Sequence, residues 1–208
     1  MTAPRQDRFE IRGRNGMSDY REDSDVKIAD GKFGKSEDFF DALEFIEETK
    51  KQRFNGNDAK AKMLGQNIVS SFSYNAAPDD LLALAEEFGV EVTPEVLLQI
   101  KILSVFSAEV CLNSLLPSAM LSGVAVNALY DVLDRVSPDF YSVLYNSTAF
   151  SFYYMCLKAG VDVAGSIGRR FAMLCGDRDS RKLAFFGKRL YELNTEVYTK
   201  AISGVAFV

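Results

Sequence analysis

From residue 36 onward, apolar residues recur every three or four positions, which is the spacing of a helix with one buried face. The first such run predicts a helix over residues 36 to 53. Ser36 is a typical N-cap, and Asn55-Gly56-Asn57 ends the pattern. A second run predicts a helix over residues 58 to 72.

Glycine and proline mark where the next helices end and begin. We expect a helix over residues 78 to 88, ended by Gly89 in the left-handed conformation with Val90 packing back on the last turn. Thr93 is then expected to cap the following helix, with Pro94 at its first position. The same Gly-Val stop recurs at Gly160.

The rest of the chain continues the helical spacing. It predicts helices over residues 94–116, 118–135, 138–158, 163–174 and 179–202. The fold class is therefore all-α, a single-domain bundle of seven or eight helices over residues 36–208. Residues 111–130 and 140–157 carry no charge, so we expect the three helices that contain them to form the buried centre, without a solvent face.

Residues 1–35 have a different character. They are rich in charged residues, asparagine and glycine, and their apolar residues show no sustained period. Such a segment buries too little surface to offset its loss of conformational entropy. We expect a flexible N-terminal tail, disordered or loosely attached, without a secretory signal.

The composition of the chain argues against several kinds of catalytic and metal site. The 208 residues include no histidine and no tryptophan, and the formal net charge is −5. Histidine is the commonest general base and metal ligand, and its absence argues against a catalytic triad or a histidine-ligated metal. Gly31 to Ser36 resembles part of a phosphate-binding loop, but Ala29 stands where that loop needs glycine. We expect no cofactor, no metal and no enzymatic activity.

The cysteines and the uncharged stretches indicate in which cellular compartment the protein is expected and whether it crosses a membrane. Cys111, Cys156 and Cys175 are far apart and form no Cys-x-x-Cys pair, so free thiols in a reducing cytoplasm are expected. The uncharged stretches are long enough to approach a membrane span, but both contain asparagine and several serines. We therefore expect buried helices and no membrane span.

Aromatic residues crowd the predicted helix 138–158. One interpretation is ordinary core packing; the other is a mostly apolar ligand pocket with a few polar groups. The candidate ligand-binding residues are Tyr141, Tyr145, Asn146, Phe150, Tyr153 and Tyr154.

Charge is unevenly distributed along the chain. Residues 36–100 carry 13 acidic and 5 basic residues, and residues 161–208 carry 5 acidic and 8 basic residues. The basic end could bind phosphate or RNA, face the acidic half within one chain or across a dimer, or simply be solvated. With a negative total charge, we expect no nucleic-acid partner. The candidate basic face consists of Arg169, Arg170, Arg181, Lys182, Lys188 and Arg189.

These observations favour a non-enzymatic cytoplasmic helical protein that acts through protein–protein contacts. Its expected partner is another protein or a second copy in a homo-oligomer, because the chain has more apolar helix than one small domain must bury. The alternative is a helical sensor or carrier that binds a small apolar ligand against the aromatic helix 138–158.

Overall fold

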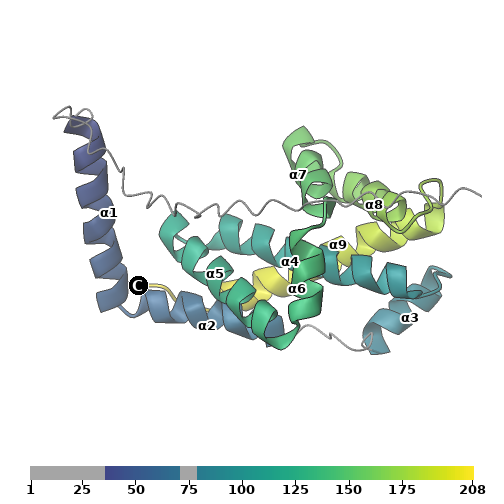
Figure 1. Ribbon diagram of the computed structural model, residues 1–208, viewed down its shortest axis with the longest axis horizontal. Coiled ribbons are helices and arrows are strands. Elements are labelled where there is room, and N and C mark those ends of the chain that lie inside the picture. Colours follow the sequence, from purple (N-terminus) through teal and green to yellow (C-terminus); the bar gives the residue numbers. More distant parts are fainter. Residues whose placement is uncertain (1–35, 71–78) are drawn as a thin grey trace, which may run out of the picture. The chain divides into compact units, whose positions relative to one another are not determined.

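The computed structural model in Figure 1 describes residues 36–70 and 79–208. The chain divides into two units between Ala42 and Leu43, inside its first helix. Apart from the start of that helix, the described residues belong to the second unit, Leu43–Val208. The predicted tail, residues 1–35, lies outside the described residues, and the predicted domain start at residue 36 stays a prediction.

The prediction of an all-α fold is confirmed. The described residues form helices and the turns between them, and no strand occurs among them. Within these ranges the helices are α1 (Ser36–Phe54), α2 (Asn57–Ser70), α3 (Asp79–Glu87), α4 (Pro94–Leu115), α5 (Ala119–Val136), α6 (Pro138–Tyr145), α7 (Ala149–Ala159), α8 (Val163–Leu174) and α9 (Arg181–Ser203).

The predicted stop and start between α3 and α4 is confirmed in its details. Gly89 has a φ of +61°, and the N–H of Val90 donates to the carbonyl of Ala85 at 2.8 Å. The Thr93 hydroxyl accepts from the N–H of Val96 at 3.3 Å, which caps α4. Gly160 also ends α7 with a φ of +70°, but Val161 is 78% exposed, so the valine of this second stop does not pack back. In each case the local sequence alone determines the helix end.

Helix α4 forms the centre of the core. It packs against α5 and α9 and also contacts α7 and α8, and Figure 1 shows it running through the middle of this unit beside α9. Leu103, Phe106 and Leu112 on α4 are completely buried. The middle of α4 is therefore buried as expected, but its C-terminal end is not, since Asn113, Ser114 and Leu115 are exposed. The expectation that residues 140–157 have no solvent face is wrong, because the Tyr145 side chain is 80% exposed and that of Met155 is 57% exposed.

The predicted single helix over residues 138–158 is also wrong, since α6 and α7 are separate helices. Two side chains at the break bond to the local backbone. The Asn146 amide donates to the carbonyl of Ser142 at 2.8 Å, and the Ser147 hydroxyl accepts from the N–H of Ala149 at 3.1 Å. Such bonds compete with the regular helical pattern and favour a turn.

Candidate functional site

The first candidate site is a pocket of about 650 Å³ beside α5 and α6, a volume that suits a small-molecule ligand. Tyrosine rings dominate its wall. The ring centroids of Tyr130 and Tyr141 are 6.3 Å apart, and those of Tyr141 and Tyr145 are 6.5 Å apart. We call this the aromatic pocket; its lining consists of Asn127, Tyr130, Asp131, Tyr141, Leu144, Tyr145, Ser147 and Phe150.

A carboxylate outside the lining holds one residue of the aromatic pocket, Tyr130, in place. Glu109 on α4 accepts hydrogen bonds from the hydroxyls of Tyr130 on α5 and Tyr154 on α7. Burial, and next the neighbouring Glu109, raise the pKa of both tyrosines well above the ordinary value. Both hydroxyls therefore remain protonated donors over the physiological range, and three helices are held together at this point.

The predicted ligand-binding residues separate into two groups. Tyr141, Tyr145 and Phe150 line the aromatic pocket. The other three are not part of its lining. Asn146 is exposed and bonds to the local backbone, and the Tyr154 hydroxyl is engaged by Glu109. Tyr153 is completely buried against Phe106, with 5.1 Å between their ring centroids.

Sequence reasoning missed the contribution of α5 to the aromatic pocket. Asn127, Tyr130 and Asp131 all line it. They are three and four residues apart, so they share one face of the helix. This polar face on an otherwise apolar helix is the signal that could have found them.

A second pocket, of about 610 Å³, brings basic side chains together beside α7, α8 and the turn before α9. We call it the arginine pocket. Its lining includes Arg169 and Arg170 of the predicted basic face, and Arg178, which the prediction omitted. Apolar and sulfur-containing side chains complete the wall, among them Met155, Cys156, Ala159 and Met173.

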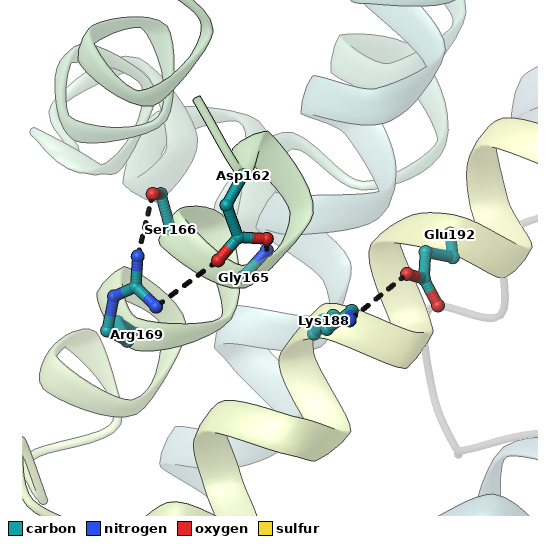
Figure 2. Close-up of polar contacts among 6 residues, drawn as sticks. All are labelled: Asp162, Gly165, Ser166, Arg169, Lys188 and Glu192. Carbon is teal, nitrogen blue, oxygen red and sulfur yellow. Dashed lines mark hydrogen bonds and ion pairs between the residues drawn. The ribbon is translucent and has the colours of Figure 1, made fainter. Parts of the chain in front are cut away.

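Two of these arginines are held in place by neighbours. Arg169 forms an ion pair of 3.5 Å with Asp162 and donates to the Ser166 hydroxyl at 2.9 Å, as Figure 2 shows. Asp162 also accepts from the N–H of Gly165, so it caps α8 at the same time. The Arg170 guanidinium lies over the ring of Phe152, 5.7 Å from its centroid.

The remaining predicted basic residues have other surroundings. Lys188 and Arg189 both pair with Glu192 at 3.8 Å, the first of these pairs being visible in Figure 2. The Lys182 ammonium lies at the C-terminal end of α3, since a Cβ built on Gly89 would be 3.2 Å from its nitrogen, and a cation is favourable there. Arg181 is exposed at the start of α9. Several of the predicted basic residues are thus partly neutralised by contacts within the chain.

The second half of α1 presents a third candidate surface. Phe54 is 91% exposed, and Leu43 and Ile46 are also exposed. These three residues are spaced so that they lie on one face of the helix, which we call the α1 face. Phe45 is exposed as well, on a different side of α1.

A network of hydrogen bonds connects the C-terminal end of α1 to Val208, the last residue described. Asn57, which is buried, donates to the carbonyl of Val208 and accepts from its N–H at 3.1 Å. The Asn57 amide also donates to Gln52 at 2.6 Å, and Gln52 in turn donates to Glu48. The last turns of α1 are therefore fixed to the start of α2.

Compared with known protein families, curated proteins and solved structures, the chain matches none of them. Across residues 36–70 and 79–208, no helix combines the length and the apolar character needed to cross a membrane. Within the same ranges, no three acidic, histidine or cysteine side chains are grouped as they are around a metal ion.

Proposed function

We propose that this protein acts through contacts with other proteins, first of all with a second copy of itself, and without catalysis. The observation that carries the proposal is the α1 face, where Leu43, Ile46 and Phe54 lie exposed together. Single exposed apolar residues are ordinary, whereas three on one helix face, here with Lys50 between Ile46 and Phe54, are typical of a contact surface.

The charges on α1 favour a second copy as the occupant. Glu44, Glu47 and Glu48 precede the basic Lys50, Lys51 and Arg53 along the helix. If two copies of α1 pair in an antiparallel direction, the acidic part of each lies opposite the basic part of the other. A two-fold symmetric interface uses the same surface twice, so it requires this kind of self-complementarity.

The polar network at the base of α1 supports the same proposal. Because Asn57 and Gln52 join the end of α1 to α2 and to Val208, the α1 face is held on a fixed support. A surface that is already ordered loses less entropy when it binds. The free thiols of Cys111, Cys156 and Cys175 are consistent with a reducing cytoplasm as the place of action.

Sedimentation velocity and native mass spectrometry of the full chain test this proposal. We expect a dimer that the double substitution Leu43→Glu, Ile46→Glu converts to a monomer, because it places charge in the apolar contact. The matched control is Val197→Glu, which changes an exposed valine on α9 and should leave the dimer intact. A wild-type chain that stays monomeric at high concentration would overturn the proposal.

A charge exchange tests the antiparallel direction. Reversing only Glu44 and Glu47 to lysine opposes like charges in both halves of the interface and should weaken the dimer. Reversing Lys51 and Arg53 to glutamate as well restores opposite charges and should recover it, although the helix dipole then disfavours both ends. No recovery in the fourfold variant would contradict antiparallel pairing.

The aromatic pocket favours a second candidate function, a carrier or sensor of a small ligand. Its supporting observation is the wall formed by Tyr130, Tyr141 and Tyr145, in which the Tyr130 hydroxyl is held by a hydrogen bond to Glu109. Native mass spectrometry of the purified chain, released from cells without denaturation, should then show a co-purified small molecule. Tyr145→Leu should remove that molecule without changing the helical content.

A further inference from the structure

The geometry points to a small quaternary ammonium compound as the ligand of the aromatic pocket. This inference rests on the second candidate function, because it presumes that the pocket binds a ligand and specifies its chemical class. It replaces the neutral apolar ligand that the sequence suggested with an organic cation. Three properties of the lining residues support it: the aromatic rings, the charge and the large share of the wall that offers rings instead of hydrogen-bond acceptors.

The ring faces provide the first argument. The faces of aromatic rings carry negative electrostatic potential, which attracts cations placed within about 6 Å of the ring centroid. Three tyrosine rings border this one pocket, with neighbouring centroids 6.3 and 6.5 Å apart. Tyr130 also donates its hydroxyl proton to Glu109, and a hydrogen bond in this direction polarises electron density toward its ring.

The charge of the lining provides the second argument. Among the described residues, Asp131 is the one charged member of the lining, which includes no lysine or arginine. Arg135, one turn further along α5, is outside the lining. A second carboxylate, Glu109, lies behind Tyr130. An anion would be repelled here, and a neutral ligand would gain no charge–charge attraction from either carboxylate.

The third argument concerns hydrogen bonding. A primary ammonium group carries three N–H donors that need acceptors once water is removed. Four of the lining residues are aromatic and one is a leucine, and the side-chain acceptors besides the tyrosine hydroxyls are those of Asn127, Asp131 and Ser147, so most of the wall offers rings and not acceptors. A quaternary ammonium group has no donors and spreads its charge over alkyl groups, so ring faces satisfy it. The chemistry of the lining therefore selects the alkylated cation.

Choline and its neutral analogue 3,3-dimethylbutanol test this inference, since they have nearly the same shape and differ in charge. Binding to the full chain is measured by isothermal titration calorimetry at low salt. Tyrosine fluorescence provides a second readout, which no tryptophan obscures. We expect choline to bind with a dissociation constant that is roughly tenfold or more below that of the neutral analogue.

Two variants assign the binding to this pocket. Asp131→Asn and Tyr145→Leu change exposed residues of the lining and should each weaken choline binding several-fold. Asp134→Asn is the matched control, because it neutralises another exposed carboxylate on α5 that is outside the lining. The control variant should bind choline as the wild type does.

The outcomes separate the two proposals. Equal binding of choline and 3,3-dimethylbutanol, lost in Tyr145→Leu, would overturn the cation inference and leave the second candidate function standing. Binding of choline that none of the pocket variants changes would also overturn the inference. If neither compound nor any co-purified molecule binds, both the inference and the second candidate function fail.

Discussion

A Cβ built on Gly65 of α2 would lie 2.0 Å from the main-chain oxygen of Ala125 on α5. The two helix backbones are therefore in direct contact at this point. Both residues are buried, and α2 and α5 pack against each other along their lengths. Because the obstacle is backbone, a larger residue at position 65 forces the helices apart.

We expect Gly65→Ala to lower the free energy of unfolding by about 1–3 kcal/mol, as overpacking of a core does. The matched control is Gly123→Ala on α5, where a Cβ would meet nothing within 4 Å. There the same change should raise stability by about 0.5–1 kcal/mol, because alanine is the better helix former. Urea denaturation of both variants checks the prediction. Equal effects of the same sign would contradict it.

Tyr153 leads to a second prediction. Its hydroxyl is buried and has no hydrogen-bond partner among the described residues. A buried polar group without a partner costs about 1–3 kcal/mol. We therefore expect Tyr153→Phe to leave stability at pH 7 unchanged or to increase it, in contrast to most core substitutions. Tyr130→Phe is the control: it removes a donor to Glu109 and should be destabilising.

Stability should decline at high pH. Burial raises the pKa of Tyr153, and burial together with Glu109 raises the pKa of Tyr130, above the value of about 10 expected in the unfolded chain. Above that pH the unfolded chain releases protons that the folded chain keeps. Unfolding is then favoured by about 1.4 kcal/mol per pH unit for each such tyrosine. Below that pH these tyrosines contribute no pH dependence.

Urea denaturation between pH 8 and pH 11 measures this slope. Tyr153→Phe should reduce this slope by the contribution of one tyrosine, about 1.4 kcal/mol per pH unit. Burial also raises the pKa of the Cys175 thiol to about 12, so Cys175→Ala should remove a decline that begins at lower pH than that of the tyrosines. A stability curve that stays flat to pH 11 would contradict the raised pKa values of these groups.

The helix ends were predicted correctly where one or two residues are enough to stop or cap a helix. Gly89 and Thr93 are examples, because a left-handed glycine and a capping hydroxyl act within one turn of the helix. The break at Asn146 was missed because apolar spacing continues through it. The pairing of Glu109 with Tyr130 and Tyr154 joins residues 21 and 45 positions apart, and periodicity within a helix carries no information about such contacts.

The network around Asn57 leads to a further prediction. Asn57→Ala removes the hydrogen bonds to Val208 and to Gln52 and leaves the side-chain oxygen of the buried Gln52 without this donor. We expect a loss of about 1–3 kcal/mol of stability. Asn55→Ala removes one exposed hydrogen bond to the same carbonyl and should have a much smaller effect. Hydrogen exchange at residues 205–208 should become faster in the first variant only.

The basic residues lead to the last prediction, that nucleic acid binds poorly. Arg169 pairs with Asp162, and Lys188 and Arg189 share Glu192, so part of the positive charge is neutralised within the chain. The acidic residues of the first half add long-range repulsion. Binding to nonspecific RNA or DNA at physiological salt should be weaker than the roughly 10⁻⁴–10⁻⁶ M typical of nonspecific binders. Fluorescence anisotropy across a salt series measures it. Tight binding with a steep salt dependence, abolished by Arg181→Glu with Lys188→Glu, would show that these residues form a nucleic-acid surface.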